Sequence, residues 1–112
     1  MGVIEELTLQ EEFVIFELIH RRTKQLIVHS YLYYHLNESV ILDSTFDLWC
    51  KELCELKEKY SDIAAQTPYW KIGQKFDATG SGFFITQYPN ELMLQANILV
   101  YGFGGKGKKG SS

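Results

Sequence analysis

Residues 8–36 constrain the fold of this chain more than any other feature. Their apolar positions recur every three or four residues, and the stretch contains neither glycine nor proline. This spacing is typical of one long amphipathic helix, and Thr8 followed by Glu11 matches the capping box that begins a helix. The apolar stripe consists of Leu9, Phe13, Phe16, His20, Thr23, Ile27, Tyr31 and Tyr34. A stripe this long needs cover from more than one other element.

A second amphipathic stretch follows after a short connector. Residues 44–60 place apolar side chains three and four apart, with charged side chains on the opposite face. Asp43 or Ser44 is expected to cap this helix, with Asp47 in the capping-box position after Ser44. Two helices joined by so few residues form an antiparallel hairpin. The predicted fold is therefore all-α, an antiparallel helical hairpin of about 8–36 and 44–60 with a shorter C-terminal element.

The C-terminal half has a weaker pattern. Residues 63–65 predict a short turn, and glycines and a proline interrupt residues 73–90. Residues 91–101 fit either a helix, by their length, or a strand, by their Ile-Leu-Val-Tyr end. Residues 1–101 are expected to form a single helical domain, and residues 102–112, rich in Gly, Lys and Ser, to form a flexible tail.

Charge and composition narrow the classes of function. The chain of 112 residues has a formal charge of −3 and 46% hydrophobic residues, which is ordinary for a globular domain. Three lysines lie in the tail, so residues 1–100 are more acidic still, which disfavours nucleic acid as a direct partner. No apolar run is long enough to cross a membrane, and the acidic N-terminus lacks the basic region of a secretory signal. A cytoplasmic protein without a membrane partner is expected.

The two cysteines indicate neither a disulfide nor a metal site. Cys50 and Cys54 lie one turn apart on the second helix, and no further Cys/His pair stands at zinc-ligand spacing. Both are interpreted as buried apolar residues, and no metal is expected. The basic run at 21–24 is interpreted as solvent-exposed, with the alternative that one cation reaches a ligand phosphate or an acidic partner.

Aromatic and acidic side chains meet where the hairpin turns. Tyr31, Tyr33 and Tyr34 end the first helix. Asp43 and Asp47 stand four apart at the start of the second helix, so both carboxylates share one face. Aromatic faces beside carboxylates suit a flat cationic ring, and carboxylates accept hydrogen bonds from ribose hydroxyls. This chemistry favours a nicotinamide ribotide, whereas the alternative is that the tyrosines are core or rim aromatics and Asp43 is a helix cap.

Residues 29–68 also carry a longer pattern. HSYLYY is followed by DSTFD, a Leu/Glu-rich helix and Thr67-Pro68. This stretch resembles the small N-terminal helical domain of bacterial NAD-dependent DNA ligases, whose pattern is His-x-Tyr-x-Tyr-[Tyr/His], then Asp-x-x-Tyr-Asp, a similar helix and Thr-Pro. In that family the domain holds the nicotinamide mononucleotide half of NAD. The resemblance implies NAD or nicotinamide mononucleotide as the ligand here.

The resemblance also implies which positions contact the ligand. The candidate ligand-binding residues are His29, Tyr33, Tyr34, Asp43, Phe46 and Asp47. The two tyrosines would face the nicotinamide, and the three residues of the second helix would line the ribotide. The family's tyrosine is Phe46 here, which removes one hydroxyl, and Ser39 stands where the family's connector usually has proline.

Ligase catalysis is not expected of this chain. A ligase needs a Lys-x-Asp-Gly motif followed by a long adenylation domain, and the nearest match is Lys75-Phe76-Asp77-Ala78. Alanine replaces the glycine and too few residues follow, so this match is interpreted as chance. The chain also resembles short ligase-related proteins encoded by phages of Gram-positive bacteria, which share its TLQEEFVIFELIH opening. That resemblance implies a stand-alone, phage-encoded module.

These patterns leave alternative hypotheses about function open. The first is a non-catalytic module that binds NAD-like or nicotinamide mononucleotide-like ligands at the hairpin base. The alternative is a phage protein-interaction module that binds or inhibits a host protein, because the apolar stripe is wide for so short a chain. The same stripe is consistent with a homodimer. A third hypothesis joins the two, with the module sequestering an NAD-derived host defence signal.

Overall fold

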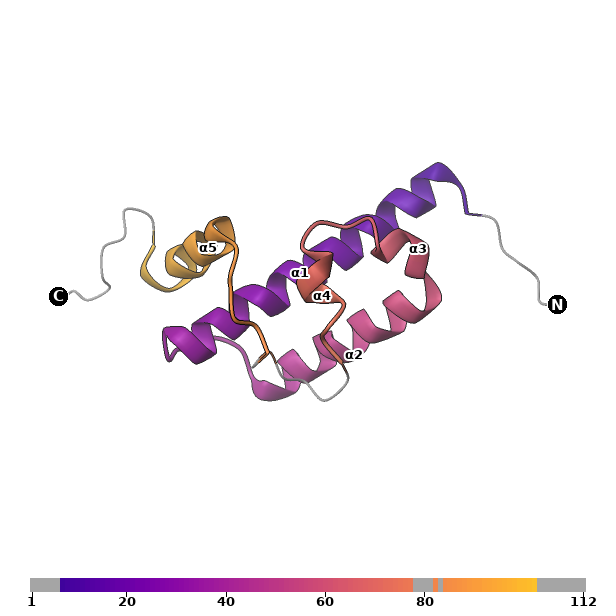
Figure 1. The fold of residues 1–112 in the computed structure, drawn as a ribbon. Coiled ribbons are helices and arrows are strands. Elements are labelled where there is room, and N and C mark those ends of the chain that lie inside the picture. The colour runs from indigo at the N-terminus through magenta and orange to yellow at the C-terminus, as the bar shows by residue number, and fades with distance from the viewer. Residues whose placement is uncertain (1–6, 78–81, 83, 103–112) are drawn as a thin grey trace.

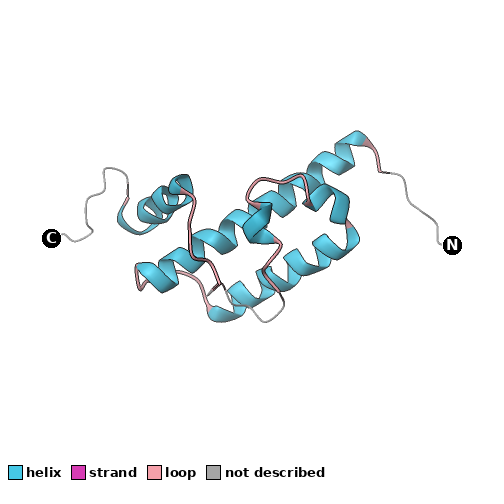
Figure 2. Cartoon of the chain, in the orientation of Figure 1, coloured by secondary structure: helices cyan, strands magenta, loops and turns pink. Residues whose placement is uncertain are grey.

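The structure is a computed structural model that describes residues 7–77, 82 and 84–102. These residues form five helices and no strand (Figure 2). In chain order the helices are α1 (Leu9–His35), α2 (Asp43–Lys59), α3 (Ser61–Ala64), α4 (Trp70–Gly73) and α5 (Asn90–Tyr101). α1 and α2 pack together and run in opposite directions (Figure 1), so the predicted all-α hairpin is confirmed. Within this part of the chain, no helix combines the length and apolarity needed to cross a membrane.

α1 begins at the predicted capping box. The Glu11 amide donates to Thr8 Oγ1 and the Thr8 amide donates to Glu11 Oε1, both at 3.0 Å. At the other end, Asn37 has a left-handed backbone with a φ of 57°, a conformation that asparagine adopts more readily than most residues. The Glu38 amide then donates to Leu32 O at 2.8 Å. This turn ends α1 and leads the chain toward α2.

α2 begins one residue earlier than predicted, and the predicted cap is wrong. Leu42 is the N-cap residue, and no side chain caps the helix. The Leu42 carbonyl instead accepts the amides of Thr45 and Phe46 at 3.0 and 3.1 Å. Asp43 therefore lies inside the first turn, where a carboxylate interacts favourably with the helix dipole. Its carboxylate is not used for capping, which removes the alternative that Asp43 is only a cap.

α1 is the centre of the fold. It contacts α2, α3, α4 and α5, and the later helices lie around it in Figure 1. The large apolar side chains that are fully buried are Ile19, Leu26, Ile27, Leu32, Leu53, Phe76 and Leu92. The apolar stripe is thus covered by several elements along its middle, as expected. Its N-terminal end is not covered, because Leu9 and Phe13 stay 84% and 62% exposed.

Residues 91–101, for which the sequence allowed a helix or a strand, lie in a helix. Leu92 and Ala96, four apart on α5, are buried, and α5 packs on α1. Gly102 ends the helix with a φ of 83°, a conformation that glycine adopts without strain. The remainder of the predicted tail, residues 103–112, lies outside the described residues.

Two short helices complete the described fold. α3 lies at the predicted turn, whereas α4 includes Gly73, where irregular backbone was expected. α4 approaches α1 closely at this glycine, because a Cβ there would lie 2.8 Å from Thr23 Cγ2. Tyr69, just before α4, donates its hydroxyl to Glu91 Oε2 at 2.5 Å. This bond ties the start of α4 to the start of α5.

Candidate functional site

A pocket of about 260 Å³ lies at the base of the hairpin, between the end of α1, the connector and the start of α2. Its lining residues are His29, Ser30, Tyr33, Tyr34, Glu38, Ser39, Val40, Ile41, Leu42, Asp43, Phe46, Asp47 and Gly82. All six candidate residues from the sequence line this one pocket. The hairpin therefore brings together side chains from two helices that the sequence pattern singled out.

α1 presents its pocket residues through helical spacing. His29 stands four residues before Tyr33, and Ser30 stands four before Tyr34, so the four share one side of the last turns. The Tyr33 and Tyr34 rings lie 4.9 Å apart at an interplanar angle of 85°, and the residues are 55% and 40% exposed. A flat ring can stack face to face on only one of two perpendicular rings. The tyrosines thus offer one stacking face and one ring edge.

α2 supplies two carboxylates and one aromatic ring. Asp43 and Asp47 are exposed, and Phe46 is half-buried. The Phe46 ring meets the Phe76 ring edge to face, with 6.4 Å between centroids. Phe76 is fully buried and contacts the Phe84 ring at 5.0 Å in the same manner. The pocket wall at Phe46 is therefore anchored in the core, while the carboxylates lie at the exposed rim.

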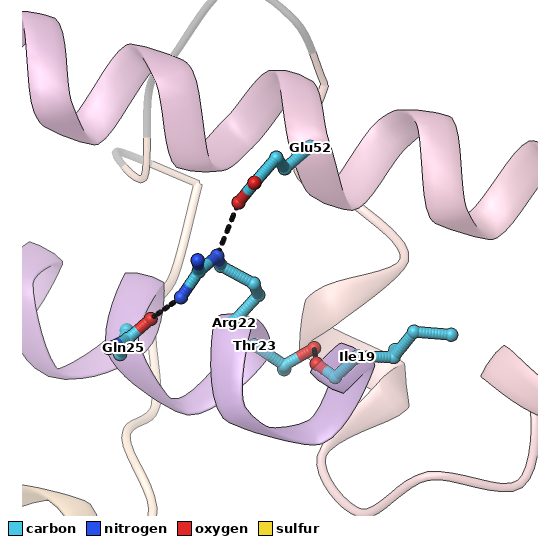
Figure 3. A network of polar contacts seen from close by, with 5 residues as sticks. All are labelled: Ile19, Arg22, Thr23, Gln25 and Glu52. Carbon is cyan, nitrogen blue, oxygen red and sulfur yellow. Dashed lines mark hydrogen bonds and ion pairs between the residues drawn. The ribbon is translucent and has the colours of Figure 1, made fainter. Parts of the chain in front are cut away.

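His29 lines the pocket and also packs against α2. It meets the Trp49 ring of α2 edge to face, with 5.5 Å between ring centroids, and the Arg22 guanidinium lies over that indole at 5.5 Å. Arg22 donates through Nε to Glu52 Oε1 and through Nη1 to Gln25 Oε1, each at 2.5 Å (Figure 3). This cation of the basic run is thus paired within the chain. The His29–Trp49 and Arg22–Glu52 contacts both join α1 to α2.

The pocket is acidic. Glu38, Asp43 and Asp47 contribute carboxylates, and no lysine or arginine is among the described residues that line it. Burial lowers the pKa of His29 below its ordinary value of 6.5, so the imidazole is neutral at pH 7 and does not offset this charge. A pocket of this charge attracts cations, and an aromatic face adds to the attraction when the cation is a flat ring.

Several lining residues were not among the sequence candidates. Ser30 stands three and four residues before the two tyrosines on the same helix, so its position was a usable signal. The connector residues 38–42 are predicted only to join the helices, and the structure adds them to the pocket wall. Gly82 belongs to a distant segment, and no local pattern relates it to the hairpin base.

The cysteines lie in the core and its border. Cys50 is fully buried, and burial raises the pKa of its thiol to about 12. Cys54 is half-buried, and its thiol donates to Phe76 O at 3.6 Å. Cys50 therefore packs as an apolar residue, as predicted. Across the described part of the chain, no group of three or more His, Cys, Asp or Glu side chains is placed to hold a metal ion.

The segment that resembles a ligase nucleophile motif has a packing role. Phe76 is fully buried and belongs to the core. Lys75 is exposed and does not line the pocket, and Ala78 lies outside the described residues. Phe76 therefore ties this segment to the core.

Among known proteins, a DNA ligase from Thermodesulfovibrio yellowstonii is 36% identical to this chain over 55 residues. Part of this chain is therefore related to DNA ligase. The aligned stretch is 49% of this chain and 8% of the ligase, so the chain spans a small part of that relative's length. No protein-family model matches the chain. No solved structure matches it either.

His29 is expected to make the folded protein less stable in mild acid. Its pKa in the folded state is lower than its ordinary 6.5, so the unfolded chain binds the extra proton as the pH falls through 6.5. The free energy of unfolding therefore decreases from about pH 7.5 toward about pH 5.5, which urea titrations at several pH values measure. His29→Gln is expected to flatten part of this dependence, and His20, whose pKa burial also lowers, accounts for part of the remainder. An unchanged slope in the variant contradicts the assignment.

Proposed function

We propose that this protein is a non-catalytic module that binds nicotinamide-containing nucleotides, NAD or nicotinamide mononucleotide, in the pocket at the hairpin base. One observation carries the proposal: the six residues that the ligase resemblance implies all line one pocket. Part of the chain is similar to a DNA ligase, which agrees with the ligase part of that resemblance.

The chemistry of the lining residues suits a nicotinamide riboside unit. The ring of such a ligand carries a positive charge, which the acidic pocket attracts, and the exposed face of a tyrosine stacks on it. The carboxylates of Asp43 and Asp47 accept hydrogen bonds from ribose hydroxyls. The volume of about 260 Å³ is near the lower end of ordinary small-molecule pockets, roughly 300 Å³. It favours one ring and its ribose over a whole dinucleotide inside the pocket.

Binding without group transfer is proposed because no lysine is among the described residues that line the pocket. Nucleotide transfer to the protein requires an activated side chain such as a lysine beside the bound phosphate. Lys75 is the residue that corresponds to the nucleophilic lysine of the ligase motif, and it does not line the pocket. No other lysine among the described residues lines it either. The acidic lining residues are suited to holding a cation rather than a transferred phosphoryl group.

Isothermal titration calorimetry of the full chain with nicotinamide mononucleotide and NAD tests the proposal. Both ligands are expected to give saturable heat, with a Kd between about 10 μM and 1 mM. AMP is the control, because it lacks the cationic ring, and is expected to give none. Nicotinic acid mononucleotide is expected to bind more weakly than the amide, since its carboxylate adds negative charge inside an acidic pocket. Absence of heat with nicotinamide mononucleotide at about 5 mM contradicts the proposal.

A different observation favours a second candidate function, protein interaction. The first turns of α1 leave Leu9, Phe13 and Val14 exposed at 84%, 62% and 58%. Neighbouring exposed apolar side chains of this size are typical of contact surfaces, here for a second copy of the chain or for a host protein. Sedimentation velocity is expected to show concentration-dependent association that Phe13→Asp abolishes. A monomer at all concentrations argues against the homodimer.

A further inference from the structure

The buried hydroxyl groups of the described residues differ in how they are paired. Thr23 Oγ1 donates to Ile19 O at 2.8 Å (Figure 3), and Thr67 Oγ1 donates to Ala64 O at 2.7 Å. Ser30 is only 1% exposed, yet its hydroxyl has no hydrogen-bond partner among the described residues. The two threonines, outside the pocket, are thus satisfied by carbonyls one helical turn away, while the serine that lines the pocket is not.

An unpaired buried hydroxyl is unfavourable for the folded protein. It has lost its hydrogen bonds to water and gained none in return, and such groups are uncommon in native structures and often mark a functional position. The Tyr88 hydroxyl is also unpaired, but Tyr88 does not line the pocket. Ser30 therefore stands out because it combines an unpaired donor with a place in the binding pocket.

Gly82 lies directly in front of the Ser30 hydroxyl. A Cβ at position 82 would collide with Ser30 Oγ and would lie 2.8 Å from Ser30 Cβ. Both residues line the pocket, and Gly82 is buried. Any side chain at position 82 would displace Ser30, so glycine allows this segment to pack directly against the serine at the buried end of the pocket.

Exposure along the pocket indicates how a nicotinamide riboside would enter. Asp43 and Asp47, which suit the ribose, are exposed, whereas Ser30 and Gly82 are buried. With the ribose at the rim, the ring points inward, and its carboxamide is the polar group that reaches the buried end. A carboxamide carries both a donor and an acceptor, which matches a hydroxyl in either role.

Resting on the proposed function, we infer that Ser30 determines specificity for the carboxamide of the nicotinamide ring. The Ser30 hydroxyl, which has no hydrogen-bond partner among the described residues, forms a hydrogen bond with the ligand's carboxamide. A cationic ring without a carboxamide cannot form this bond. Two opposite effects follow from removal of this hydroxyl. Selectivity for the carboxamide is lost, and the ligand-free protein becomes more stable.

NMR titrations with 1-methylnicotinamide and 1-methylpyridinium test this inference, because the two cationic rings differ by the carboxamide alone. The full chain is expected to bind 1-methylnicotinamide about tenfold more tightly. Ser30→Ala is expected to abolish that preference, to leave the affinity for 1-methylpyridinium unchanged, and to raise the Tm by about 4 °C or more. A residue with a merely structural role would not combine higher stability with lost selectivity.

Matched variants complete the experiment. Ser61→Ala removes the hydroxyl of an exposed serine on α3 outside the pocket and is expected to change neither the preference nor the Tm. Ser30→Cys replaces the hydroxyl with a somewhat larger, weakly hydrogen-bonding thiol and is expected to lose the preference as well. A tenfold preference that survives in Ser30→Ala or Ser30→Cys overturns the inference and leaves the proposed function standing. A wild-type chain that binds neither ring nor nicotinamide mononucleotide overturns the proposed function itself.

Discussion

Phe76→Ala is expected to lower the free energy of unfolding by about 3–5 kcal/mol. The side chain is fully buried, and its ring contacts the rings of Phe46 and Phe84 at 6.4 and 5.0 Å. Truncation removes apolar burial and leaves a cavity behind Phe46, whose ring forms part of the pocket wall. Urea unfolding followed by circular dichroism measures the change. A domain of this size is expected to be stable by roughly 5–15 kcal/mol, so the loss would be a large share of the total.

Phe13→Ala is the matched control for this prediction. Phe13 is 62% exposed, and its truncation is expected to change the free energy of unfolding by less than about 0.5 kcal/mol. A loss below about 1 kcal/mol in Phe76→Ala, or equal losses in both variants, argues against the core described above.

The double substitution Tyr33→Ala with Asp47→Ala is expected to weaken binding of nicotinamide mononucleotide by about 100-fold. An aromatic stacking contact contributes roughly 0.5–1.5 kcal/mol and a hydrogen bond to a charged group roughly 1.5–3 kcal/mol. Their sum of roughly 2–4.5 kcal/mol corresponds to a loss of affinity between about 30-fold and about 2,000-fold, and about 100-fold lies within this range. Both residues are exposed, so the free energy of unfolding is expected to change by less than about 1 kcal/mol. Calorimetric titration of the folded variant measures the affinity.

A carboxylate outside the pocket provides the control for that variant. Asp62→Ala on α3 removes an exposed acidic side chain that does not line the pocket, and it is expected to leave the affinity within about twofold of wild type. Retained affinity in the double variant, or an equal loss in Asp62→Ala, speaks against the pocket as the binding site.

The hairpin was predictable because each of its helices is encoded by a pattern of neighbouring residues. Residues 8–36 repeat their apolar positions without a breaker, and Thr8 with Glu11 forms the expected capping box. The candidate site was predictable for a related reason. His29, Tyr33 and Tyr34 share one side of α1, and Asp43 and Asp47 share one face of α2, so closing the hairpin suffices to bring them together.

The start of α2 and the buried end of the pocket depend on contacts that no local pattern encodes. Asp43 and Ser44 are strong capping residues, yet Leu42 is the N-cap residue and no side chain caps the helix. Gly82 reaches Ser30 across the fold, and this contact rests on tertiary packing rather than on sequence spacing. The helical structure of α5 also depends on tertiary packing. Its residues are compatible with a helix or a strand, and packing against α1 favours the helix.

We propose that the acidic pocket at the hairpin base holds a nicotinamide riboside unit. A crystal structure of the full chain with nicotinamide mononucleotide tests it most directly. Ligand density is expected in the pocket, with the ring against Tyr33 or Tyr34, the ribose hydroxyls at Asp43 and Asp47, and the carboxamide at Ser30. A pocket without ligand density at saturating nucleotide, or density for the nucleotide at another surface, would contradict it.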